Sequence, residues 1–229
     1  MRSLTMITAG LAGERDPAQP LLTYYDGPSR VELSGSTTAN WVAKTANLMV
    51  DGYGEPGKIG ILLPLHWQFV VILLAGVAVE ATVEVAATPG GLDGCDFVFV
   101  HAPHAETVRD LGLDVDEVFA LSGHPLGAPC HGLGSSITDY AREVPSFADF
   151  FGGDLPMGAG IQLNRRLVPL PLADGWTAAD RVLITGSPST PAGLATILRA
   201  LRVGASLVLA TGAVDLAAIS AAERVTQVA

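Results

Sequence analysis

Short apolar runs alternate along the chain with segments whose apolar residues recur every three or four positions. The runs have the length of buried β-strands, and the recurring segments have the period of amphipathic helices. The runs predict strands at residues 30–33, 58–63, 82–86, 96–100, 117–121, 181–184 and 206–210. The periodic segments predict helices after the hydroxyl residues 36–38 and over 66–81, 105–111, 191–203 and 215–225, with 137–151 of mixed character. Strands that alternate with helices favour an α/β fold of layered, largely parallel sheets flanked by helices.

The most regular unit is the strand–helix–strand sequence between residues 58 and 86, which favours a parallel strand pair with a right-handed crossover. Its apolar run, residues 59–79, is long enough to suggest a membrane span. Pro64, Leu65 and His66 divide that run, however, and the uninterrupted part, residues 69–79, is too short to cross a bilayer. We therefore expect a buried strand followed by a buried core helix, and no membrane span.

Glycine and proline mark the segments between these elements. Residues 1–20 look like a loose lead-in, 123–136 form a Gly/Pro-rich loop, and 152–175 are linker-like. Residues 1–12 carry one early arginine and a short apolar stretch broken by threonine, which does not fit a signal peptide. With 229 residues the chain is long enough for a single compact unit or for two small lobes.

The charge balance narrows the classes of partner. The chain has 13 Lys and Arg against 23 Asp and Glu, for a formal net charge of −10, and no basic stripe interrupts this balance. A nucleic acid or an anionic membrane surface would be repelled, so neither is expected as a partner. The two cysteines, Cys95 and Cys130, are too few for a disulfide framework, which fits a reducing, cytoplasmic location. Only two cations are lysines, Lys44 and Lys58.

Several stretches resemble, in the same order, the first part of the adenylate-forming superfamily: acyl-CoA synthetases, luciferases and peptide-synthetase adenylation domains. One helix, residues 69–81, is similar to the family's long apolar helix, with Glu80 where glycine is usual. The other stretches are residues 31–34 leading into 40–48, Gly57-Lys-Ile-Gly-Ile-Leu-Leu-Pro64, 180–183, 192–194 and 201–209. The chain also resembles a short, uncharacterised actinobacterial family related to these enzymes.

This resemblance implies both a fold and a set of functional positions. It implies that residues 20–55 pack with 176–229 around one sheet, and that 58–150 form a second sublobe. The family's chemistry rests on a phosphate loop of the type T/S-G-T/S-T-G-x-P-K-G, on an acidic tyrosine motif with an aspartate around the adenosine, and on a lysine of a mobile C-terminal domain. The sequence stops at Ala229, before the positions of the last two groups, so the resemblance implies that this chain lacks them.

The stretch TGSPSTPAG, residues 185–193, can be aligned with the family in two ways. One alignment lays it over the phosphate loop, matching Thr185, Gly186, Ser187, Pro191 and Gly193. The other alignment starts from residues 180–183 and makes the stretch a later turn of the family, P-L-F-H, so that the true phosphate loop is deleted before Trp176. We prefer the second because it brings the following helix and strand into register without gaps.

Both alignments predict that no phosphate loop works here. Such a loop needs converging backbone N–H groups and a cation. In the first alignment Pro188 removes one N–H, Ser189 restricts a turn that glycine would permit, and Ala192 takes the place of the lysine. Losing that charge-assisted contact alone forfeits about 1.5–3 kcal/mol of binding.

Other residues of the chain could carry chemistry but also fit ordinary packing roles. His66 and Trp67 lie where a strand gives way to a helix, the usual position of a ligand crevice in open α/β sheets. The alternative, which we favour, is that Trp67 anchors the helix to the core and His66 is a half-buried cap. The spacings of the histidines and of Cys130 match no known zinc pattern, and no G-x-S-x-G elbow surrounds Ser187 or Ser189. The four histidines concerned are His101, His104, His124 and His131.

The sequence therefore predicts a non-catalytic relative of acyl-adenylating enzymes, with no catalytic residue, no cofactor and no metal. It would act by binding a small acyl or nucleotide-like ligand, or a protein partner, and an uncovered sheet edge would favour a homo-oligomer. Two alternatives stay open: a subunit or enzyme of acyl and adenylate metabolism completed in trans, and a purely structural scaffold. The ligand-cleft candidates are His66, Trp67, Thr185, Gly186 and Ser187.

Overall fold

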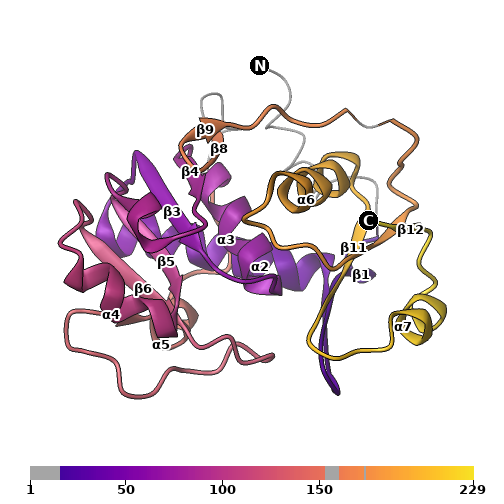
Figure 1. The fold of residues 1–229 in the computed structure, drawn as a ribbon, viewed down its shortest axis with the longest axis horizontal. Helices are drawn as coiled ribbons and strands as arrows, with labels where there is room; N and C mark the ends of the chain where they lie inside the picture. Colours follow the sequence, from indigo (N-terminus) through magenta and orange to yellow (C-terminus); the bar gives the residue numbers. More distant parts are fainter. Residues whose placement is uncertain (1–15, 153–159, 173) are drawn as a thin grey trace.

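The described residues of the chain form two mostly parallel β-sheets flanked by helices (Figure 1). The computed structural model describes residues 16–152, 160–172 and 174–229. The predicted α/β fold is confirmed. Most of the expected lead-in, and residues 153–159 and 173 of the linker-like segment, lie outside the described residues.

The larger sheet has seven strands in the order β7-β6-β5-β3-β4-β8-β9. Every neighbouring pair is parallel except β8 and β9, which form an antiparallel hairpin. The strands are β3 (Lys58–Leu62), β4 (Thr82–Val85), β5 (Phe97–His101), β6 (Glu117–Leu121), β7 (Thr138–Asp139), β8 (Ile161–Leu163) and β9 (Arg166–Leu167). The helices between them are α3 (Trp67–Ala78), η2 (Pro89–Leu92), α4 (Ala102–Asp110), α5 (Tyr140–Glu143) and η3 (Val144–Ser146).

The smaller sheet joins the two ends of the described chain, with five strands in the order β12-β10-β11-β1-β2. Only β1 and β2 pair antiparallel. The strands are β1 (Pro20–Asp26), β2 (Ser29–Ser34), β10 (Arg181–Ile184), β11 (Ser206–Thr211) and β12 (Gln227–Val228). The helices are α2 (Gly35–Asn47), which continues into the π-helix η1 (Leu48–Tyr53), then α6 (Pro191–Val203) and α7 (Leu216–Ala222).

Helix α3 lies in the shared core of the two sheets. Nearly all of its residues are buried, and it packs against α2 and against strands of both sheets. Gly76 allows the close approach to the larger sheet, because a β-carbon there would lie 2.7 Å from Cγ2 of Val83. As predicted, β3, α3 and β4 form a parallel β-α-β unit. No helix in the described part of the chain is long and apolar enough to cross a membrane.

Several element boundaries differ from the sequence-based expectation for local reasons. Helix α2 begins at Gly35, because the Ser34 hydroxyl, placed before the expected hydroxyl residues, accepts the Thr37 N–H at 3.1 Å. Helix α3 ends at Ala78, because Glu80 adopts a left-handed conformation with a φ of 61°. Strands β8 and β9 lie inside the Gly/Pro-rich segment 152–175, and β1 begins where the expected lead-in ends.

Candidate functional site

The loop between β10 and α6 contains the stretch that resembles a phosphate loop. Thr185 and Ser187 are exposed and Gly186 is partly exposed. The carbonyl oxygen of Ser187 accepts the backbone N–H of Thr190 at 3.2 Å and its hydroxyl at 2.8 Å. The Thr190 hydroxyl in turn accepts the backbone N–H of Gly193 at 3.2 Å and so caps α6. These N–H groups are thus bonded within the chain, and the loop serves as a helix cap.

The close approach between this loop and α6 requires a glycine at position 193. A β-carbon there would overlap the Ser187 carbonyl oxygen and would lie 2.8 Å from the carbonyl carbon. Proline at the first position of the helix, Pro191, costs no hydrogen bond, because the N–H of that position is unpaired in any helix. Ala192, which takes the place of the lysine in the first alignment, is exposed and brings no charge.

His66 and Trp67 are at the start of α3 and both are buried, with 3% and 2% of their surface exposed. Nδ1 of His66 accepts the backbone N–H of Gln68 at 3.2 Å, which makes His66 the cap of α3. Nε1 of Trp67 donates to the carbonyl oxygen of Pro125 at 2.9 Å. Both side chains are therefore used in helix capping and core packing, and His66 is more deeply buried than the expected half-buried cap.

The environment of His66 disfavours its charged form. Burial lowers its pKa to about 4, although the backbone of His124 offsets part of this effect. Nε2 makes no hydrogen bond of normal geometry with the described residues. The Tyr24 ring meets the imidazole edge-to-face at 4.5 Å between centroids. His66 is therefore neutral at physiological pH.

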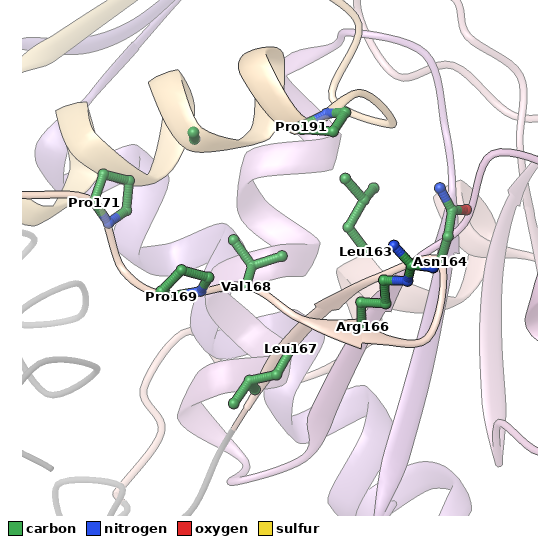
Figure 2. A pocket seen from close by; sticks show the side chains of 9 residues that line it. Leu163, Asn164, Arg166, Leu167, Val168, Pro169, Pro171 and Pro191 are labelled. Atoms are coloured by element: carbon green, nitrogen blue, oxygen red, sulfur yellow. The ribbon is translucent and has the colours of Figure 1, made fainter.

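A cleft of about 710 Å³ lies between α6 and the β8–β9 hairpin (Figure 2). Most of its lining is apolar, and two polar side chains, Asn164 and Arg166, lie at the hairpin end. Figure 2 shows Leu163 pointing toward α6, with Pro191 at the start of that helix. The lining residues are Leu163, Asn164, Arg166, Leu167, Val168, Pro169, Pro171, Pro191 and Ala195. None of the five candidate residues from the sequence lines this cleft; of TGSPSTPAG, only Pro191 does.

The segment that follows β9 forms one side of the cleft through Val168, Pro169 and Pro171, and Leu172, Asp174 and Trp176 lie farther along α6. Two arginines of α6 hold this segment in place. Arg202 donates to the Pro171 carbonyl oxygen at 2.5 Å, and Arg199 donates to the Asp174 carbonyl oxygen. The Arg199 guanidinium also lies 4.2 Å from the ring centre of Trp176. The cleft continues along α6 into a second hollow of about 390 Å³, which shares Pro171 and Ala195 with it.

The hairpin that forms the floor of the cleft turns through two residues, Asn164 and Arg165, whose φ angles are 49° and 64°. Three hydrogen-bonding groups fix this turn to β4 and the residues that follow it. The N–H of Arg165 lies 2.9 and 3.0 Å from the carboxylate oxygens of Glu84, which is fully buried. The backbone N–H of Asn164 donates to the Val85 carbonyl oxygen, and its side-chain Oδ1 accepts the Ala87 N–H, each at 3.1 Å. The turn is therefore tightly held.

In the described part of the chain, the histidine and cysteine residues do not assemble a metal site. Among the described residues no group of three or more His, Cys, Asp or Glu side chains could hold a metal ion. The rings of His101 and His104 are 6.4 Å apart. Burial raises the pKa of both cysteine thiols to about 11, so Cys95 and Cys130 are protonated at neutral pH and are poor nucleophiles.

Comparison with known proteins found a relative that matches most of the chain. A protein of Mycobacterium tuberculosis (strain ATCC 25618 / H37Rv) described as a "TIGR03089 family protein" is 36% identical over 204 residues. The match covers 84% of this chain and 83% of the relative. No protein-family model matches the chain.

Solved structures of acyl-CoA synthetases share the fold. An acyl-CoA synthetase of Brucella canis has a TM-score of 0.77 at 15% identity, and the match covers 97% of this chain and 46% of the synthetase. Apo MatB from Rhodopseudomonas palustris has a TM-score of 0.69 at 15% identity, and the match covers 99% of this chain and 48% of MatB. The Mycobacterium tuberculosis fatty acyl CoA synthetase has a TM-score of 0.66 at 14% identity, and the match covers 98% of this chain and 48% of the synthetase. The chain thus spans about half the length of these synthetases and matches their N-terminal half.

Proposed function

The chain belongs to the family of the mycobacterial TIGR03089 protein, and from that premise we propose that it is a non-catalytic relative of acyl-adenylating enzymes that binds a small ligand. The observation that carries this proposal is the cleft between α6 and the β8–β9 hairpin. A concave, mostly apolar cleft of several hundred Å³ with a few polar groups at one end is the usual form of a small-molecule site.

The lining of the cleft favours an apolar ligand with an anionic end. Arg166 is exposed and makes no ion pair with any described residue, so its guanidinium is available at the mouth of the cleft. Asn164 adds a polar side chain at the same end. An acyl chain with a carboxylate therefore fits the cleft better than a bare nucleotide.

Two observations support the absence of self-sufficient acyl activation. The stretch TGSPSTPAG has no lysine, and the N–H groups of Thr190 and Gly193 are already bonded. The gapless alignment deletes the phosphate loop before Trp176, and the two-residue turn of the β8–β9 hairpin lies in that stretch. A turn of this length, held by Glu84, leaves no loop to surround a polyphosphate.

Ligand binding can be tested by isothermal titration calorimetry with fatty acids of increasing length, the matching alcohols, AMP and a non-hydrolysable acyl-adenylate mimic. We expect the acids to bind, and Ala195→Trp to weaken that binding at least tenfold because the indole would fill the cleft. Ala218→Trp, an exposed alanine of α7, is the matched control. Arg166→Gln should weaken the binding of the acids and leave the binding of any alcohol unchanged. Binding that Ala195→Trp does not affect would contradict the assignment of the cleft.

The alternative of an enzyme completed in trans makes a different prediction. Exchange of labelled pyrophosphate into ATP, measured with the acids that bind, should stay at background for the purified chain. A signal that appears on addition of a partner protein would favour the subunit alternative. A signal from the purified chain alone would refute the non-catalytic proposal. If the chain binds no small molecule, the alternative of a purely structural scaffold is favoured.

A further inference from the structure

Strand β2 is an edge of the five-stranded sheet, and six residues make it the longest edge strand of the two sheets in the described part of the chain. The β1–β2 hairpin projects at the lower side of the molecule in Figure 1. Its turn consists of Gly27 and Pro28, and Asp26 and Ser29 form the closing pair. An exposed strand of this length offers unpaired backbone groups to a second strand.

The turn determines which backbone groups of β2 are free. In a two-residue hairpin the closing pair is hydrogen-bonded, and hydrogen-bonded pairs then alternate along the strands. Ser29, Val31 and Leu33 therefore use their N–H and C=O groups toward β1. The N–H and C=O groups of Arg30 and Glu32 point outward, and no described residue is hydrogen-bonded to them there.

The side chains of the same two residues carry opposite charges. Arg30 and Glu32 lie on one face of the strand, with 42% and 36% of their side chains exposed. Two other side chains hold Arg30 in position, because its Nε donates to Glu223, the C-cap residue of α7, at 2.8 Å and to the Tyr25 hydroxyl at 3.1 Å. Its Nη2 group reaches toward the edge, where it binds Glu32 of its own strand.

Charge selects one register if a second copy of β2 pairs with this edge. Antiparallel pairing must place residues with outward-facing groups opposite each other. A two-fold axis at Arg30 would put Arg30 opposite Arg30, and an axis at Glu32 would put Glu32 opposite Glu32; both are repulsive. An axis at Val31 puts each Arg30 opposite the other copy's Glu32, so that four backbone hydrogen bonds and two ion pairs form together.

We infer that the outer edge of β2 is a self-association surface, on which a second copy of this chain pairs antiparallel about a two-fold axis at Val31. The two small sheets then form one continuous sheet of ten strands. Charges on an edge strand usually prevent pairing. Here their alternation is self-complementary, so they reject the wrong registers and permit this one. The inference is independent of the ligand cleft.

Sedimentation equilibrium with two charge variants tests this surface. Glu32→Arg gives an edge with two positive charges and Arg30→Glu gives an edge with two negative charges, so each variant alone should dissociate at least about tenfold more readily than the wild type. A mixture of the two restores both opposite-charge pairs and should dimerise like the wild type. Circular dichroism shows whether each variant is folded, and Glu32→Arg keeps the Arg30–Glu223 contact intact.

Two further variants give readouts that do not depend on charge. Glu32→Pro removes an outward N–H without touching the ladder to β1, and should also give monomers. Val31→Cys places two cysteines at the axis, about 4.5 Å apart between α-carbons, within the range for a disulfide. It should form a covalent dimer on mild oxidation. Ser29→Cys is the matched control, because its two copies would be about 14 Å apart in this register.

These measurements either support or exclude pairing of two copies through β2. A covalent Val31→Cys dimer, with rescue of dimerisation in the mixture of charge variants, would support it. A wild type that stays monomeric at about 1 mM chain would overturn it. So would a wild-type dimer whose stability Glu32→Arg and Glu32→Pro leave unchanged, because its interface would then lie elsewhere.

Discussion

Acidification should destabilise the fold through His66. The imidazole is 3% exposed, caps α3 through Nδ1, and has a folded-state pKa lowered by burial from 6.5 to about 4. The charged and titratable groups that face it also disfavour a proton: His101 and His124 repel it electrostatically, and Tyr24 is neutral. Protonation would thus place an uncompensated charge in the core that joins the two sheets.

The magnitude and the sign follow from the two pKa values. The unfolded chain binds a proton at His66 near pH 6.5, whereas the folded chain does so only near pH 4. The unfolded state therefore holds more protons between these values, and the free energy of unfolding falls as the pH is lowered. A difference of about 2.5 units corresponds to about 3 kcal/mol lost between pH 7.5 and pH 4. Above pH 6.5 the contribution is fully present.

Urea unfolding followed by circular dichroism between pH 7.5 and pH 4 measures this loss. His66→Asn keeps a helix cap but cannot be protonated, so its free energy of unfolding should fall by about 3 kcal/mol less than that of the wild type over this range. His124→Gln, at an exposed histidine, should follow the wild type closely. Burial also lowers the pKa of His101, and the comparison between variants removes that contribution. Parallel curves for the wild type and His66→Asn would refute the reasoning.

One position that would gain a glycine and one that would lose a glycine give further predictions, both measured by urea unfolding. Glu80→Gly should stabilise the chain by about 1 kcal/mol, because Glu80 follows α3 with a φ of 61°, a conformation that is strained for any residue with a β-carbon. Glu80→Ala should show no such gain, and equal stability of the two variants would contradict this reasoning. Gly193→Ala should destabilise by about 3 kcal/mol, because its β-carbon would overlap the Ser187 carbonyl. Gly90→Ala, where a β-carbon meets nothing within 4 Å, is its control, and similar losses for both would contradict the overlap.

The parts of the fold that could be predicted are those with a strong local signal. Residues 191–203 were predicted as a helix and form α6 with the same bounds, because threonine, proline and glycine mark its ends and its apolar residues have helical spacing. The strands that flank α3 were also predicted, since both are continuous apolar runs. The expected helix 66–81 was too long, because the left-handed residue that ends it is a glutamate and carries no stop signal in the sequence.

The parts that could not be predicted depend on partners far away in the sequence. Strand β1 is paired with β11, 185 residues away (Leu22 with Leu207), and its sequence PLLTYYD has no regular alternation. Strands β8 and β9 have three and two residues and lie in a Gly/Pro-rich segment, so composition favoured a linker. The cleft combines this hairpin with α6. No local pattern could therefore have indicated it. The candidates Thr185, Gly186 and Ser187 came from the resemblance instead, and His66 and Trp67 came from their position between a strand and a helix.

The stretch TGSPSTPAG illustrates why a motif match alone carries little information about phosphate binding. Thr190 caps a helix, Pro191 occupies the first helical position, and Gly193 admits the Ser187 carbonyl, so each has a folding role in this chain. Helix N-termini in general favour these residue types. What distinguishes an anion site is a nearby cation and N–H groups left free to converge on the anion. Here Ala192 supplies no cation, and the N–H of Gly193 is already bonded, so the resemblance at this stretch reflects helix capping.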